Sequence, residues 1–169
     1  MLNESPIRFG TDGWRAIIAE DFTFANVRAC AQATALYLRQ SGMASRGIVV
    51  GYDTRFASEE FAAAVAEVMA ANGIPVYLCD RPAPTPVVGY AILTRKAAGS
   101  VVITSSHNPA AYNGFKVRNE TGGAIDPEGL KEIESGIPED VKEVVRIAYS
   151  VGEAEGKFVK FDADTPYIE

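Results

Sequence analysis

Residues 100–109 read SVVITSSHNP, an apolar run that passes directly into a polar turn. The first four residues are typical of a buried strand, and Asn108-Pro109 predicts a turn where that strand ends. In open α/β sheets, ligands bind at the carboxyl ends of strands. The stretch also holds His107, the only histidine of the chain. Because hydroxyl-rich turns are common, this stretch taken alone is equally compatible with a purely structural turn.

Segments of strand and helix character alternate before this stretch. Apolar residues recur with a period of 3.6 in segments that predict helices at 24–41 and 59–72 (with Ser58 as its cap). The pair Thr85-Pro86 is typical of a helix start and predicts a helix at 85–95. Short apolar runs predict strands at 6–9, 47–51, 74–78 and 100–104, with Pro75 marking a first position or a sheet edge. The order predicts an α/β fold, a three-layer α/β/α sandwich with a mostly parallel mixed sheet.

The segments after the turn are weaker signals. Residues 114–118 alternate apolar with basic side chains, which predicts a strand with one polar face, and 127–135 predicts a short helix. Residues 158–161 have strand character without an evident partner. We therefore expect one domain over residues 1–150, and a linker or the start of a truncated second domain over 151–169.

Composition narrows the classes of partner. The chain has 169 residues and a formal net charge of −6, which argues against nucleic acid or an anionic membrane as a partner. No apolar run reaches the roughly 20 residues of a membrane span, and the first ten residues do not resemble a signal peptide. Cys30 lies on the apolar face of a predicted helix and Cys79 ends a predicted strand, so both are predicted to be core thiols. We expect a reduced, cytoplasmic protein without a zinc site.

Basic residues gather in the segments that are expected to follow strands. These segments are 10–15, 52–55 and 104–118, and their cations are Arg15, Arg55, Lys116 and Arg118. Each one taken alone is more often a solvated surface residue. Because a parallel sheet brings such segments to one edge, together they predict a local cationic site on an acidic protein.

Ser106 is the candidate reactive group. A hydrolytic triad with His107 is disfavoured, because adjacent side chains tend to diverge and the Gly-x-Ser-x-Gly elbow is missing. A serine that carries a phosphoryl group needs cations and a metal instead, and Arg15 and Lys116 suit that role.

Three motifs resemble those of the phosphohexomutase superfamily, which includes phosphoglucomutase, phosphomannomutase and phosphoglucosamine mutase. The segment SHNP at 106–109, followed by YNGFK at 112–116, looks like the active-serine loop of that family. FGTDGWR at 9–15 resembles its N-terminal signature, and GYDTR at 51–55 its Gly-x-Asp-x-Arg loop. The motifs occur in the family's order, and the resemblance covers roughly residues 7 to 150.

The resemblance implies a set of roles. Ser106 would be the phosphoserine that exchanges its phosphoryl group with hexose 1- and 6-phosphates through a hexose 1,6-bisphosphate, and its phosphate would also be a ligand of Mg²⁺. Lys116 would stabilise charge or transfer a proton, and Arg15 would face the same phosphate. His107 would be a supporting contact or only order the loop. Asp53 and Arg55 are expected to stabilise the loop.

Members of this family have four domains, and only the first is recognisable here. The other metal ligands and the sugar-binding loops would lie in domains II–IV of the same full-length chain, so this chain alone is expected to be nearly inactive. Asp162 and Asp164 lack the rest of the family's metal loop and are more simply solvated. Alternative interpretations are a phosphoglucosamine mutase, a non-catalytic sugar-phosphate-binding module and, more weakly, an unrelated serine hydrolase.

Overall fold

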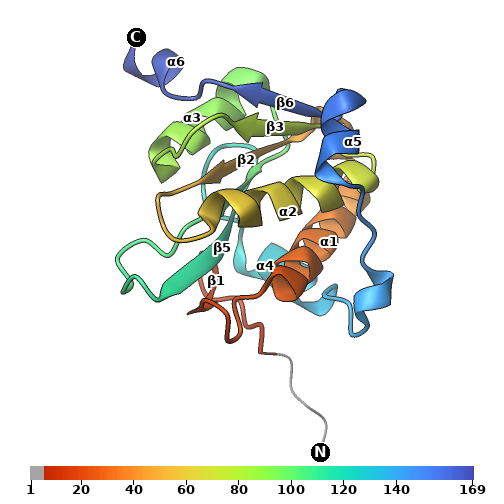
Figure 1. The fold of residues 1–169 in the computed structure, drawn as a ribbon. Coiled ribbons are helices and arrows are strands. Elements are labelled where there is room, and N and C mark those ends of the chain that lie inside the picture. The colour runs from red at the N-terminus through yellow and green to blue at the C-terminus, as the bar shows by residue number, and fades with distance from the viewer. Residues whose placement is uncertain (1–5) are drawn as a thin grey trace, which may run out of the picture.

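The structure is a computed structural model that describes residues 6–169, and its middle layer is a mixed sheet of six strands (Figure 1). In sheet order these are β1 (Gly13–Ile17), β5 (Tyr112–Arg118), β4 (Ser100–Ile103), β2 (Ile48–Tyr52), β3 (Val76–Cys79) and β6 (Phe158–Phe161). Among them only β5 runs against its neighbours, whereas β4, β2, β3 and β6 pair in parallel. The predicted mostly parallel mixed sheet is confirmed.

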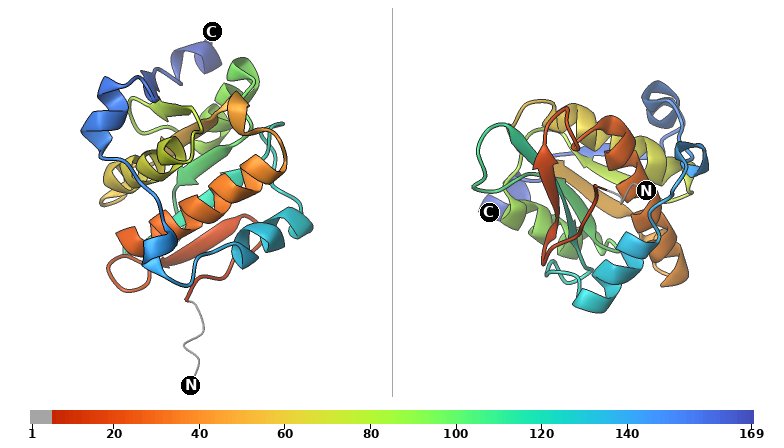
Figure 2. Two further views of the ribbon diagram at one scale, coloured as in Figure 1. Left: turned by 90° about the vertical axis from the view of Figure 1, so that its right-hand side faces the viewer. Right: turned by 90° about the horizontal axis from the view of Figure 1, so that it is seen from below.

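Helices cover both faces of this sheet (Figures 1 and 2). The helices that connect or cover the strands are α1 (Phe24–Gln40), α2 (Ser58–Ala71), α3 (Thr85–Arg95), α4 (Pro127–Ser135), α5 (Tyr149–Ala154) and α6 (Thr165–Ile168). The connections β2-α2-β3 and β3-α3-β4 run in opposite directions along the sheet, so right-handed crossovers place α2 and α3 on opposite faces. Helices α1 and α5 pack against α2, α4 packs against α1, and α6 packs against α3. This is the predicted α/β/α sandwich.

The first strand lies later in the chain than predicted. Residues 6–9 are not a strand, because the Phe9 N–H donates to the Glu134 carboxylate at 2.6 Å and a turn follows, closed by the Gly10 N–H on the Gly13 carbonyl. Strand β1 begins at Gly13, whose φ of +139° is a conformation that favours glycine. The Phe115 backbone also lies so close to Gly13 that a Cβ would not fit. Arg15 therefore lies within a strand rather than in a loop after one.

The other end of the sheet also differs from expectation. Strand β6 pairs in parallel with β3, from Val76 opposite Phe158 to Cys79 opposite Phe161. Strand β3 is therefore an interior strand, and Pro75 lies just before it rather than at a sheet edge. Residues 158–161, expected in a linker, belong to this sheet. The boundary at residue 150 otherwise remains a prediction.

One continuous apolar core fills the space between the layers. It includes an aromatic series in which Trp14 stacks on Phe22 at 5.0 Å and Phe22 meets Phe61 edge-on at 4.9 Å. Cys30 and Cys79 are buried free thiols, as predicted, and burial raises the pKa of Cys79 to about 12. Among the described residues, no helix combines the length and apolarity needed to cross a membrane.

Candidate functional site

The loop after β4 presents Ser106 to solvent. Ser106 has a left-handed backbone, with a φ of +54°, which is uncommon for a residue other than glycine. The Thr104 hydroxyl accepts a hydrogen bond from the Ser106 N–H at 3.1 Å, and the Asn108 N–H donates to the Ser105 carbonyl at 3.0 Å. These local bonds fix the turn and leave the Ser106 side chain exposed where the strand ends.

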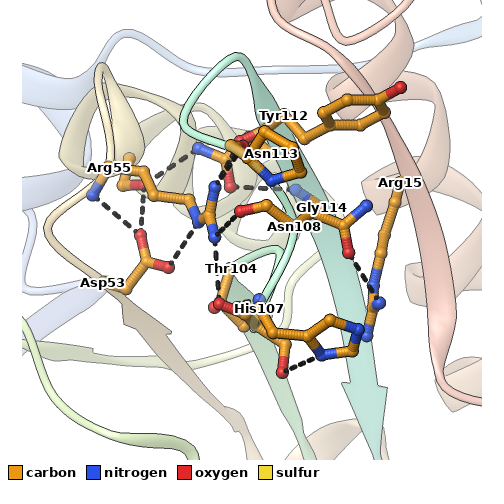
Figure 3. A network of polar contacts seen from close by, with 12 residues as sticks. Arg15, Asp53, Arg55, Thr104, His107, Asn108, Tyr112, Asn113 and Gly114 are labelled. Atoms are coloured by element: carbon orange, nitrogen blue, oxygen red, sulfur yellow. Dashed lines mark hydrogen bonds and ion pairs between the residues drawn. The ribbon is translucent and has the colours of Figure 1, made fainter.

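Arg55 holds this loop by its backbone (Figure 3). Its guanidinium donates to four carbonyls, those of Ser106 (2.9 Å), Asn108 (2.7 Å), Pro109 (2.8 Å) and Tyr112 (3.0 Å). Strands β2 and β4 are parallel neighbours, so the loop carrying Arg55 and the loop carrying Ser106 leave the same edge of the sheet. The predicted loop-stabilising role of Arg55 is confirmed.

A second set of polar side chains orients Arg55 and the start of β5 (Figure 3). Asp53 pairs with the Arg55 Nε at 3.3 Å and accepts a hydrogen bond from the Ser58 hydroxyl at 2.8 Å. The buried Asn113 donates to that hydroxyl at 2.9 Å and accepts from the Gly114 N–H at 2.8 Å. Ser58 was expected to cap α2, but Ala57 occupies the cap with a φ of +58° and Ser58 joins this network instead.

A pocket of about 320 Å³ lies beside the loop, and Arg15 and Lys116 line it together with Thr104. The Arg15 guanidinium donates to the Asn108 side-chain carbonyl at 3.0 Å, which ties β1 to the Ser106 loop. The Lys116 Nζ lies 2.9 Å from the Asp12 carboxylate. Two of the predicted cations therefore meet in one pocket, next to the residue that hydrogen-bonds the Ser106 backbone.

Asp12 is the acidic partner of these cations. Its carboxylate contacts Lys116 and, at 3.6 Å, the Arg118 guanidinium. Burial raises the pKa of Asp12. The hydrogen bond and charge of Lys116, together with the charges of Arg118 and Arg15, lower it by a larger amount, so the pKa lies below the ordinary 3.8. No role was assigned to Asp12 from the sequence. Its place in the 9–15 motif, three residues before Arg15, was the available signal.

The geometry of His107 corrects one expectation. Its Nδ1 lies 3.5 Å from the Ser106 Oγ, so the two adjacent side chains meet rather than diverge. The left-handed backbone of Ser106 changes the direction of its side chain and makes this approach possible. In the described part of the chain no carboxylate hydrogen-bonds to His107, so the orienting group of a hydrolytic triad is missing.

Acidic residues do not assemble a metal site in the described part of the chain. Residues 6–169 contain no group of three or more His, Cys, Asp or Glu that could hold an ion. The Asp162 carboxylate accepts hydrogen bonds from the Asp164 N–H, the Thr165 N–H and the Thr165 hydroxyl, so it organises the start of α6.

The fold and site together define an α/β/α domain with a constrained, exposed serine beside a cationic pocket. Residues 6–143 match the family model described as phosphoglucomutase/phosphomannomutase, alpha/beta/alpha domain I, so this chain belongs to that family.

Named relatives agree with this assignment. The chain is 41% identical over 140 residues to a Schizosaccharomyces pombe protein named "Probable phosphoribomutase", covering 80% of this chain and 24% of that protein. It is 41% identical over 145 residues to human glucose 1,6-bisphosphate synthase, covering 79% and 23%. Other relatives are named phosphoglucomutase and "Probable phosphoglucosamine mutase". The chain thus spans about a quarter of the length of these relatives.

A solved structure confirms the fold. The Thermus thermophilus protein described as a "putative phosphomannomutase" superposes with a TM-score of 0.83 at 38% identity, covering 96% of this chain and 34% of that one.

Proposed function

We propose that this domain carries the phosphoryl group of a sugar-phosphate mutase on Ser106. The observation that carries the proposal is the exposed Ser106 on a loop whose carbonyls are fixed by Arg55, next to a pocket lined by Arg15 and Lys116. Phosphoryl transfer depends mostly on positioning and on neutralising spread negative charge. A loop held by one largely buried guanidinium provides the positioning, and the two cations provide the charge.

The exchange would proceed in two balanced steps. In the first, the bond between phosphorus and the Ser106 Oγ breaks, a bond between phosphorus and a sugar hydroxyl oxygen forms, and the hydroxyl proton ends on the Ser106 Oγ. The resulting hexose bisphosphate reorients in the site, and the second step returns its other phosphoryl group to Ser106. Lys116 and Arg15 would stabilise the charge on the transferring group. His107, at 3.5 Å from the Ser106 Oγ, would contact that oxygen as it gains or loses its proton.

The donors of the described residues do not account for the Mg²⁺ that the family resemblance implies. Asp12, the one carboxylate among the described residues that line the pocket, already pairs with Lys116, and the described residues hold no ligand cluster. A phosphate on Ser106 would supply one oxygen ligand, and the remaining ligands would come from elsewhere in the full-length protein.

Substrate and partners follow as parts of the same proposal. Hexose phosphates and a hexose 1,6-bisphosphate would be the ligands, and domains II–IV of the same polypeptide would complete the site in the cytoplasm. Glucosamine phosphate is the alternative substrate, since a relative bears that name. A non-catalytic sugar-phosphate-binding module is the alternative function, because the pocket could bind an anion without transfer.

The activity test compares two neighbouring serines in the longer protein that carries this domain. Ser106→Ala should abolish conversion of hexose 1-phosphate to hexose 6-phosphate. Ser105→Ala should retain it, because the buried Ser105 Oγ has no hydrogen-bond partner among the described residues. Conversion that survives Ser106→Ala would contradict the proposal. Sugar-phosphate binding without conversion in the unsubstituted protein would favour the binding module.

A second assay addresses the 169-residue chain itself. We expect almost no turnover from it, because its described residues provide no metal ligand cluster and the sugar-binding loops that the resemblance implies would lie outside it. Robust turnover by this chain would show that the site is complete within it.

A further inference from the structure

The carboxylate of Asp12 is the only acidic group among the described residues that line the pocket, where it faces several cations. Its Oδ2 lies 2.9 Å from the Lys116 Nζ and its Oδ1 lies 3.6 Å from the Arg118 guanidinium. The Arg15 side chain enters the same pocket and donates a hydrogen bond to the uncharged side chain of Asn108. The arrangement is one negative group at the centre of a positive cluster.

Burial strengthens the electrostatic interactions within this cluster. The Lys116 side chain is only 14% exposed, so its ammonium is largely withdrawn from bulk water and depends on Asp12 for a partner. Arg118, at 19% exposure, is in a similar position. Cations at such positions repel one another more strongly than they would in water, so an anion between them lowers their electrostatic energy.

We propose that Asp12 is an internal counter-ion that holds Lys116 while the pocket contains no phosphate, and that a phosphate group displaces Asp12 from Lys116 when it enters. The inference rests on the proposed function, because the displacing group would be the phosphate carried by Ser106 or by a sugar. Asp12 is a positioning residue in this account: it acts through Lys116.

The competition follows from the chemistry of the two anions. A phosphate monoester carries a charge of about −1.5 to −2 and three acceptor oxygens, so it satisfies more donors than a single carboxylate. Arg15 can give it two parallel N–H donors in exchange for one bond to a neutral amide. Asp12 would repel the same phosphate, so binding requires Lys116 to change partners.

The direct test is a titration of the 169-residue chain with inorganic phosphate at neutral pH and fixed ionic strength. Asp12→Asn should bind phosphate about tenfold more tightly than the unsubstituted chain, because one repulsive and competing charge is removed. Glu143→Gln removes one charge at an exposed position outside the pocket and should leave the affinity unchanged. If Asp12 only holds the N-terminal loop in place, Asp12→Asn should bind phosphate equally or more weakly, and that result would overturn the proposal.

A second measurement needs no variant and stands even if Asp12→Asn does not fold. Carboxyl ¹³C NMR can follow the titration of Asp12 with and without inorganic sulfate, which remains mostly dianionic at mildly acidic pH, where phosphate is singly charged. The charged groups that act on Asp12 are Lys116 and Arg118 on β5 and Arg15 on β1, and Arg8 lines the same pocket. Sulfate that draws Lys116 away should raise the pKa of Asp12 and leave that of the remote Asp162 unchanged. No change at Asp12 under saturating sulfate would overturn the proposal.

These readouts separate this inference from the proposed function. Binding of inorganic anions requires no phosphoryl transfer, so the predicted competition can be found in a chain whose Ser106 is never phosphorylated. Conversely, Ser106 could be found phosphorylated while Asp12→Asn binds inorganic phosphate as the unsubstituted chain does. That result would support the proposed function and contradict the counter-ion role of Asp12.

Discussion

At the scale of single residues, the Arg55 guanidinium is the main support of the candidate site. It is 14% exposed and donates to four carbonyls of the segment that carries Ser106. The loop-stabilising role of Arg55 was expected from the family resemblance of residues 51–55, and the pairing of β2 with β4 explains how Arg55 reaches the loop. The sequence did not reveal Ser58 and Asn113, whose contacts join residues 55 positions apart and leave no local pattern.

Arg55→Lys tests this support. An ammonium cannot reproduce the planar array of donors, so several of the four hydrogen bonds should be lost. We expect a local loss of about 2–3 kcal/mol, seen as faster amide hydrogen exchange at Asn108 and Tyr112. The matched control is Arg81→Lys, whose side chain is 54% exposed and pairs with surface carboxylates. Exchange at the loop amides that is equally slow in both variants would contradict the role of Arg55.

Loss of the hydroxyl should change the unfolding free energy very differently at two serines near the site. Ser58→Ala should cost about 1–3 kcal/mol of unfolding free energy, because it leaves Asp53 and Asn113 without their shared partner. Ser105→Ala should change it by less than about 0.5 kcal/mol or stabilise the chain, because the buried Ser105 Oγ has no partner among the described residues. Urea denaturation measures both values, and a larger loss in Ser105→Ala would contradict the assigned contacts.

At the scale of elements, β6 shows where sequence patterns stop being informative. The strand character of residues 158–161 was recognisable from the sequence, but the partner strand β3 lies about 80 positions earlier in the chain. Local residue order carries no signal for such a pairing. The helices α1, α3 and α4 were predicted almost to the residue, because the residues that mark a helix lie within or next to the segment itself.

Phe158→Ala tests whether β6 is part of this domain. Phe158 is buried against Tyr149 at 5.1 Å between ring centroids, so its truncation should cost about 3 kcal/mol of unfolding free energy. Val159→Ala lies on the same strand at 47% exposure and should cost less than about 1 kcal/mol. Equal, small losses in both variants would indicate that residues 158–161 are a dispensable linker.

At the scale of the whole molecule, charge is distributed unevenly. The chain has a net charge of −6, yet Arg15, Lys116 and Arg118 gather around Asp12. Composition predicted that an anionic ligand would need such a local cationic region, and the pocket provides one. Composition could not indicate that an acidic residue would lie at its centre, because that depends on the antiparallel pairing of β1 with β5.

The low pKa of Asp12 makes a prediction about acid stability. Because the folded-state pKa lies below 3.8, the stabilisation is fully present above that value and is lost as pH falls through the folded pKa. Asp12 is about one third exposed, so its contribution should be roughly 1 kcal/mol or less. The difference in unfolding free energy between the unsubstituted chain and Asp12→Asn should therefore be constant near neutral pH and shrink as the pH falls through about 4 and below. A gap that stays constant over this range would contradict the ion pair.

The central claim is that Ser106 carries a phosphoryl group, and intact-mass analysis tests it most directly. The longer protein that carries this domain would be incubated with hexose 1,6-bisphosphate and compared with its Ser106→Ala and Ser105→Ala variants. We predict a mass increase of one phosphoryl group that maps to Ser106, is absent from Ser106→Ala and is retained in Ser105→Ala. No adduct on the unsubstituted protein, or an adduct that persists in Ser106→Ala, would contradict the claim.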